Sequence, residues 1–216
     1  DAALILPEKP PSLVAEAVMA VCDQPELRAQ MAADRTQRMR EARRLADMLR
    51  ALNTLDAPLI GRLHGSAFGG GVGLACICDV TLAAEGTRFS FSETRLGIIP
   101  ATIGPYVLAR MGEGRARQVF MSARPFDAGE AMRLGIVSRV AAPEDLDAQV
   151  EAEVEPYLHV APGAVAAAKR LARDLGPRID DTLIDDTIRR LADTWETAEA
   201  QAGIAAFLDK RPPPWA

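Results

Sequence analysis

The sequence predicts an α/β fold for this chain of 216 residues. Two observations carry the prediction. Short apolar runs with β-branched residues alternate with helical patterns, and one of those helices, at residues 72–78, is apolar enough to be buried on every side. Hydrophobic residues make up 49% of the chain, which is enough for a substantial core.

Composition narrows the classes of function. The formal net charge of −5 argues against sequence-independent binding to nucleic acid, which needs a basic surface. No apolar run approaches the roughly 20 residues of a membrane span, and the first residues lack the pattern of a secretory signal. We therefore expect a cytoplasmic protein without nucleic-acid or membrane partners. Cys22, Cys76 and Cys78 lack metal-ligand spacing and are interpreted as buried thiols.

Two helices are predicted before Pro58. The first follows a short strand-like run and a proline-rich turn. The second carries an apolar stripe, which consists of Leu45, Met48, Leu49, Leu52 and Leu55. Its other face is rich in arginine, namely Arg35, Arg38, Arg40, Arg43 and Arg44. That face is either a solvated surface balanced by Asp34, Glu41 and Asp47, or a binding surface for an anionic ligand.

The middle of the chain alternates strands and helices. Strands are expected within residues 58–65, 79–85, 87–91 and 136–141, and helices within residues 72–78, 103–112, 114–123 and 127–135. Residues 144–216 are mostly helical and end in one long helix that runs to Phe207. Its stripe, which we expect to pack on another subunit, consists of Ile184, Ile188, Leu191, Trp195, Ala198 and Ala202. We divide the chain into a core, residues 1–143, and a helical C-terminal region, residues 144–216.

Three consecutive glycines, Gly69 to Gly71, stand before the buried helix. Missing side chains at a helix N-terminus let a ligand touch main-chain N–H groups at the positive end of the helix dipole. A phosphate cradle, an oxyanion hole and a tight turn without a ligand all remain possible. The sequence matches a dinucleotide-binding G-x-G-x-x-G only loosely, lacks the G-K-[ST] ending of a phosphate loop, and contains no G-x-S-x-G nucleophile elbow.

The neighbouring motifs add a resemblance. In order, they are "HG", "GGGVGL", "CDVTLAAEGTRFSFSETRLGIIP", "RMG", "FDAGEAMRLGIVSRV" and the terminal "IAAFLDKRPPPW". This ordered set resembles the enoyl-CoA hydratase/isomerase family, or crotonases, over residues 45–216. The segments "AFGGGVGL" and "GIIPATIGPYV" are most similar to the bacterial methylglutaconyl-CoA hydratase-like branch, which acts in leucine degradation. The resemblance implies a crotonase fold, with a ββα superhelix core and a helical C-terminal trimerisation region.

The resemblance also implies roles for individual residues. Backbone N–H groups at Gly69 and Gly70 would hold the thioester oxygen of an acyl-CoA as it becomes an enolate, with Gly70 as the principal donor. Glu93 would be the general acid/base, and partial burial among Phe89, Phe91 and Ile98 would raise its pKa toward neutrality. The alternative for Glu93 is a surface glutamate paired with Arg95.

Gly73 stands where the best-known hydratases of the family carry a second glutamate, so this chain is expected to work with one carboxylate. Phe68, Gly73 and Tyr106 would line the acyl pocket, although Tyr106 can equally be a core residue. Lys210 would reach the CoA phosphates of a neighbouring subunit in a homotrimer or a dimer of trimers. No metal or redox cofactor is implied, since coenzyme A enters as part of the substrate.

Two stretches are shorter than the family pattern, near residues 6–12 and 28–31. We expect the protein to have the corresponding strands and CoA-binding loop, although this sequence does not include them. The predicted function is an acyl-CoA hydratase/lyase that acts on a short branched or dicarboxylic 2-enoyl-CoA. The alternatives are an enoyl-CoA isomerase and a non-catalytic acyl-CoA-binding relative.

Overall fold

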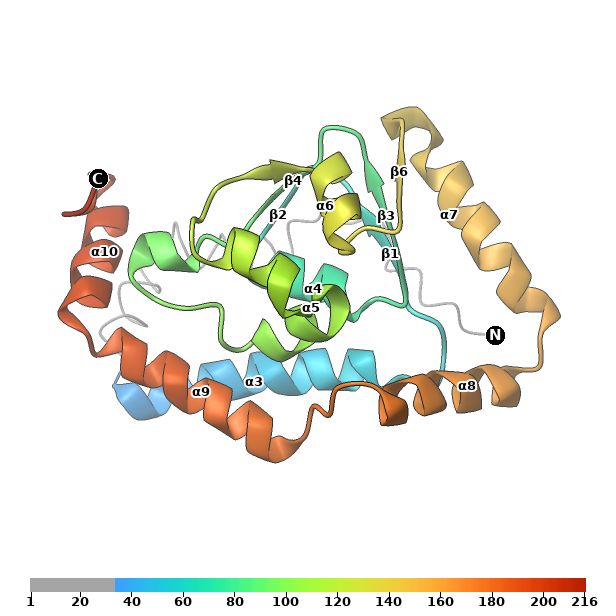
Figure 1. Ribbon diagram of the computed structural model, residues 1–216, viewed down its shortest axis with the longest axis horizontal. Coiled ribbons are helices and arrows are strands. Elements are labelled where there is room, and N and C mark those ends of the chain that lie inside the picture. The colour runs from blue at the N-terminus through green and yellow to red at the C-terminus, as the bar shows by residue number, and fades with distance from the viewer. Residues whose placement is uncertain (1–33) are drawn as a thin grey trace.

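The computed structural model describes residues 34–216. The first predicted helix and the two shortened stretches lie outside these residues. Two small sheets form the centre of the described chain (Figure 1). The first is parallel, in the order β1, β3, β6, with bounds Ile60–Leu63, Val80–Ala84 and Arg139–Ala141. The second has the order β2, β4, β5, with bounds Ser66–Phe68, Arg88–Ser90 and Phe126–Asp127; β5 is antiparallel to β4.

From β1 to β6 the chain crosses between the two sheets four times. The β1–β2 and β3–β4 pairs each contribute one strand to the first sheet and the next strand to the second. Helix α4, Gly70–Ile77, follows the first pair and is largely buried, as the apolar run predicted. Helix α5, Gly104–Phe120, packs against α4 and is kinked at Gly112, so the two helices predicted there form one bent segment. The strands β2 and β5, of three and two residues, were not predicted.

Two long helices, α3 and α9, lie side by side along one edge of the molecule (Figure 1). They are Arg35–Asn53 and Asp181–Trp195. Their apolar seam is formed by Ala42 and Ala46 from α3 and by Ile184 and Ile188 from α9. Burial of this seam is the main contribution to their pairing, because apolar area removed from water stabilises in proportion to its size.

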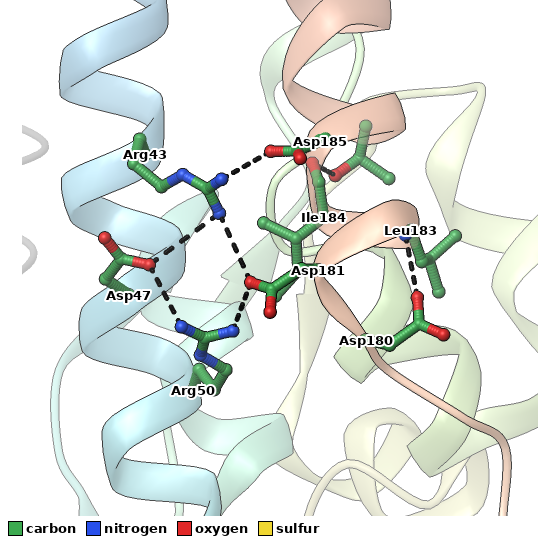
Figure 2. Close-up of polar contacts among 9 residues, drawn as sticks. Arg43, Asp47, Arg50, Asp180, Asp181, Leu183, Ile184 and Asp185 are labelled. Carbon is green, nitrogen blue, oxygen red and sulfur yellow. Dashed lines mark hydrogen bonds and ion pairs between the residues drawn. The ribbon is translucent and has the colours of Figure 1, made fainter.

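The arginine-rich face of α3 is divided between solvent and this helix pair. Arg40 is exposed and Arg44 pairs with Glu41, as the solvated-surface interpretation predicted, whereas Arg35, Arg38 and Arg43 pair with acidic residues of α9 or just after it. Figure 2 shows Arg43 bridging to Asp185 and Asp181, and Arg50 bridging to Asp181. Asp47 of α3 lies 3.8 Å from both guanidinium groups. Two further pairs, Arg35 with Asp193 and Arg38 with Glu196, extend the row toward the other end. Exposed pairs of this kind add little stability each but favour one alignment of the helices.

The prediction of one long C-terminal helix that runs to Phe207 is wrong. Helix α9 ends at Trp195, and a separate helix, α10, spans Ala198–Leu208. The break occurs because Thr197 has extended backbone angles and its hydroxyl accepts a hydrogen bond from the Ala200 N–H at 3.1 Å, which caps a new helix. The chain therefore changes direction, and α10 packs against the short 3₁₀ helix η1, Glu93–Leu96.

The packing of α10 on η1 brings the two backbones very close. A Cβ atom at Gly203 would lie 2.6 Å from the carbonyl oxygen of Leu96, and one at Gly97 would lie 2.8 Å from the backbone nitrogen of Ala200. Real side chains do not tolerate such distances, so both positions require glycine. This contact fixes the position of the segment that begins with Glu93.

The remaining helices complete the fold around the first sheet. Their bounds are Ala128–Leu134 for α6, Pro143–Asp145 for η2, Leu146–Val154 for α7, Glu155–His159 for η3 and Pro162–Leu175 for α8. Leu146 and Val150 of α7 pack on Leu82 and Ala84 of β3. Residues 144–216 are thus mainly helical, as predicted, and several of their helices cover the core of the same chain. Their role in assembling subunits stays a prediction.

The cysteine thiols and the apolar character of the helices bear on two predictions from the sequence. Cys76 is buried and Cys78 is partly buried, and burial raises the pKa of each thiol to about 12, in agreement with inert buried thiols. Cys22 lies outside the described residues. Within the described part of the chain, no helix has both the length and the apolar character that a membrane crossing requires.

The close contact between α10 and η1 makes a testable prediction. Gly203→Ala should lower the free energy of unfolding by about 1–3 kcal/mol, because the new methyl group overlaps the Leu96 carbonyl. The matched control is Gly163→Ala in α8, where a Cβ meets no atom within 4 Å and helix propensity should raise stability by up to about 1 kcal/mol. Urea unfolding of both variants measures the difference; equal stabilities would contradict the close contact.

Candidate active site

A cavity of about 720 Å³ lies between the second sheet and the C-terminal helices. Its wall is formed by α3, by the turn between β2 and α4, by η1 and the loop after it, and by α9 and α10. Most of the wall is apolar, with side chains that include Leu45, Phe68, Ile98, Ile188, Leu191, Trp195, Ile204 and Phe207. The polar minority of the wall consists of Gln37, Arg38, Glu41, Ser90, Ser92, Glu93, Arg95 and Thr102, and polar groups in a mainly apolar pocket commonly orient a ligand.

Among the acidic residues of this wall, Glu93 combines a buried, unpartnered carboxyl oxygen with a raised pKa. It begins η1 directly after β4, and its Oε2 atom is buried without a hydrogen-bond partner in residues 34–216. Burial raises the pKa of its carboxyl from 4.5 to about 7. A carboxyl in this state can give and take a proton near neutral pH.

The alternative interpretation of Glu93, a surface residue paired with Arg95, is wrong. No ion pair of the described residues includes Glu93, and the Arg95 guanidinium donates instead to the backbone oxygen of Ala123 at 3.3 Å. The rise in pKa expected from Phe89, Phe91 and Ile98 is confirmed in direction. The two phenylalanines are fully buried beneath the site and Ile98 lies in its wall.

The glycine turn faces the same cavity. Gly69 has φ 49° and ψ −114°, which a residue with a side chain rarely adopts, and its N–H donates to the Ser90 oxygen at 2.9 Å within the β2–β4 pair. The Gly70 N–H, at the first position of α4, has no acceptor in residues 34–216. Of the two predicted donors, Gly69 is therefore already engaged in the sheet, while Gly70 offers a free N–H to the cavity.

Gly73 does not line this cavity, because it lies one turn deeper in α4 and faces α5. A Cβ atom there would lie 2.4 Å from Cγ2 and 2.8 Å from Cβ of Ile103. A glutamate at this position would have to displace Ile103, which itself forms part of the wall. The packing therefore leaves no room for a second carboxylate at this position, and the contact of Gly73 with the acyl group stays a prediction.

Tyr106 is likewise absent from the cavity wall. It is 2% exposed, belongs to the main hydrophobic core and lines a different hollow of about 1060 Å³ together with Arg50, Cys78 and Lys169. The reason is geometric: Tyr106 lies near the C-terminal half of α3, whereas the cavity with Glu93 lies along its N-terminal half. The interpretation of Tyr106 as a core residue is confirmed.

Phe68 does line the cavity, and Lys210 does not. Lys210 is exposed after the end of α10, with a φ of 52°. Its predicted contact with a neighbouring subunit's CoA stays a prediction. Within residues 34–216, no cluster of three or more His, Cys, Asp or Glu side chains could hold a metal ion.

Sequence reasoning missed part of the wall. Ile188, Leu191 and Trp195 were assigned to a subunit contact, but in this chain they enclose the cavity from α9. Their spacing revealed an apolar face but not which surface it covers. Thr102 also lines the cavity, and nothing in its sequence context distinguishes it from an ordinary loop threonine.

Comparisons with known proteins agree with this architecture. The profile of the family described as Enoyl-CoA hydratase/isomerase matches residues 18–216. A short-chain-enoyl-CoA hydratase from Clostridium acetobutylicum is 32% identical over 166 residues, which cover 76% of this chain and 63% of the relative. A crotonyl-CoA hydratase from Syntrophomonas wolfei is 34% identical over 169 residues, which cover 76% of this chain and 64% of the relative. The chain thus spans slightly less than two thirds of the length of these curated relatives.

Solved structures give the same result. An enoyl-CoA hydratase from Shewanella pealeana is similar with a TM-score of 0.67 at 36% identity, over 88% of this chain and 71% of that one. An enoyl-CoA hydratase from Mycobacterium avium has a TM-score of 0.75 at 27% identity, over 84% and 72%. The predicted crotonase fold is therefore confirmed, and the chain belongs to the enoyl-CoA hydratase/isomerase family.

Proposed function

We propose that this chain carries the active site of an enoyl-CoA hydratase that uses a single carboxylate. The observation that carries the proposal is that Glu93, with one carboxyl oxygen buried without a hydrogen-bond partner, lines the same largely apolar cavity as Gly70, whose N–H has no acceptor in residues 34–216. Membership of the family supports an acyl-CoA thioester as the substrate class.

The two groups have complementary tasks. The Gly70 N–H would donate a hydrogen bond to the thioester oxygen at the positive end of α4. When a nucleophile attacks the β-carbon of a 2-enoyl thioester, negative charge moves to that oxygen, and one preorganised donor stabilises it by roughly 3 kcal/mol. The charge is then neutralised when a proton is added at the α-carbon.

Glu93 would move that proton. Its carboxylate takes a proton from water as the water oxygen bonds to the β-carbon, and the resulting carboxylic acid delivers the proton to the α-carbon. The sum is addition of one water molecule, and the carboxylate is regenerated. A pKa of about 7 suits both transfers, since neither protonation state is strongly disfavoured.

Within this class we propose a short branched or dicarboxylic acyl group, as in the methylglutaconyl-CoA hydratase-like branch. The similarity of "AFGGGVGL" and "GIIPATIGPYV" to that branch supports this choice. Arg95 also lines the cavity and has no carboxylate partner among the ion pairs of residues 34–216, so its guanidinium could pair with a distal carboxylate of the substrate. We further propose a homotrimer or a dimer of trimers, in which Lys210 contacts the CoA of a neighbouring subunit.

A second candidate is an enoyl-CoA isomerase. The observation that favours it is the packing of Gly73 on Ile103, which leaves one carboxylate where a two-carboxylate hydratase has two. Moving a proton between the α- and γ-carbons needs one base and no water. The two reactions differ in whether water is consumed, so they can be separated directly.

The activity is tested with the four-carbon 2-enoyl-CoA and with a 3-enoyl-CoA, each followed by chromatography of the products. We expect wild-type protein to hydrate the first substrate, and Glu93→Gln to reduce the rate at least about 100-fold, because the amide can neither accept nor return a proton. Glu85→Gln is the matched control, since Glu85 is exposed in the β3–β4 turn.

Conversion of the 3-enoyl-CoA without hydration of either substrate would support the isomerase and overturn the hydratase. Full activity of Glu93→Gln would show that the assignment of the acid/base is wrong. A protein that binds these thioesters and turns over neither would match a non-catalytic relative.

Burial of Glu93 also predicts a dependence of stability on pH. Its pKa is about 7 in the folded state and near 4.5 unfolded, so the folded protein binds this proton more tightly. The favourable contribution of the protonated form is complete below pH 4.5 and is lost as pH rises to about 7. Glu93→Gln is neutral throughout and should gain stability relative to wild type over this range, by at most about 3 kcal/mol.

Urea unfolding at pH 5, 6, 7 and 8 measures that gain, again with Glu85→Gln as the control. A stability difference between Glu93→Gln and wild type that does not change from pH 5 to pH 8 would show that Glu93 titrates like an exposed carboxyl.

A further inference from the structure

Thr102 is a second polar group of the cavity wall without a partner. It is only 5% exposed, and its Oγ1 atom is buried without a hydrogen-bond partner in residues 34–216. Burying a hydroxyl without a partner carries a free-energy penalty, so such a group calls for a specific explanation. The Thr87 and Thr94 hydroxyls are buried in the same way, but neither residue lines this cavity.

Thr102 is held in place by the segment that starts with Glu93. The Ile98 N–H donates to the Glu93 oxygen at 3.1 Å, the Ala101 N–H to the Ile99 oxygen at 2.8 Å, and the Gly104 N–H to the Ala101 oxygen at 3.1 Å. These bonds fold the loop between η1 and α5 tightly against the cavity. Glu93 and Thr102 therefore belong to one short, hydrogen-bonded segment, and both residues line the same cavity.

The same loop explains why a further polar group is needed. Ile103, the next residue, occupies the space beside Gly73 and prevents a side chain there. A single carboxylate can accept one O–H of a water molecule but leaves the other O–H without an acceptor. The cavity is far larger than a water molecule requires, so an unanchored water could take many orientations.

We propose that the Thr102 hydroxyl orients the attacking water together with Glu93, in the place of a second carboxylate. The water donates one hydrogen to the Glu93 carboxylate and the other to Thr102 Oγ. As the water oxygen bonds to the β-carbon, the first hydrogen passes to Glu93 and then to the α-carbon, while Thr102 neither gains nor loses a proton. This role rests on the proposed hydratase function and deepens it.

The test compares two reactions of the same site. Hydration of the four-carbon 2-enoyl-CoA needs an oriented water, whereas exchange of the α-proton of the saturated four-carbon acyl-CoA in D₂O needs only Glu93 and Gly70. Thr102→Val keeps the shape of the side chain and removes the hydroxyl. We expect it to lower the kcat of hydration about tenfold or more and to leave the exchange rate within about twofold of wild type.

Two control variants accompany it. Thr102→Ser keeps the hydroxyl and should retain hydration, and Thr87→Val removes a buried, unpartnered hydroxyl outside the cavity and should hydrate at the wild-type rate. Thr102→Val should be at least as resistant to urea as wild type, because it removes a buried hydroxyl that has no partner.

The outcomes distinguish failure of the proposed role of Thr102 from failure of the proposed hydratase function. Unchanged hydration in Thr102→Val, or a parallel fall of hydration and exchange, would overturn the role of Thr102 while the hydratase function stands. If wild-type protein exchanges the α-proton but hydrates no 2-enoyl-CoA, the hydratase function itself fails and the role of Thr102 fails with it.

Discussion

The contact between α10 and η1 is the constraint on which the site depends. Gly203 and Gly97 allow the two backbones to meet without side chains between them, so the C-terminal helix closes over the segment that begins with Glu93. In that segment one oxygen of the Glu93 carboxyl is buried without a hydrogen-bond partner in residues 34–216, and burial raises the pKa of the carboxyl to about 7.

The rest of the C-terminal region completes the wall of the cavity that Glu93 lines. The break at Thr197 turns α10 toward η1, and the preceding helix α9 lies along α3 so that both complete the cavity wall. The buried seam supplies most of the energy of that pairing, while the row of arginines and aspartates in Figure 2 favours one alignment. Charges that suggested an anionic ligand in the sequence thus act between two helices of one chain.

Local sequence patterns were enough to predict those features of the fold and site that depend on residues close together in the chain. The strands β1, β3 and β4, the buried α4, and the rise in the pKa of Glu93 followed from apolar runs and flanking phenylalanines. Contacts between distant segments could not be predicted: the clash of position 73 with Ile103, the side of the core that takes Tyr106, and the loop that presents Thr102. The break at Thr197 was hidden because the apolar stripe continues across it with helical spacing.

The central claim is that Glu93 is a buried, single acid/base with a pKa near neutrality, and its titration is the most direct measurement. Protein labelled with ¹³C at the glutamate side-chain carboxyl carbon can be titrated by NMR, and the Glu93→Gln spectrum identifies the Glu93 signal. The structure predicts a midpoint at about pH 7, well above the ordinary value of 4.5 for a glutamate carboxyl. A midpoint close to 4.5 would mean that water reaches the carboxyl freely and that the cavity is not closed as described.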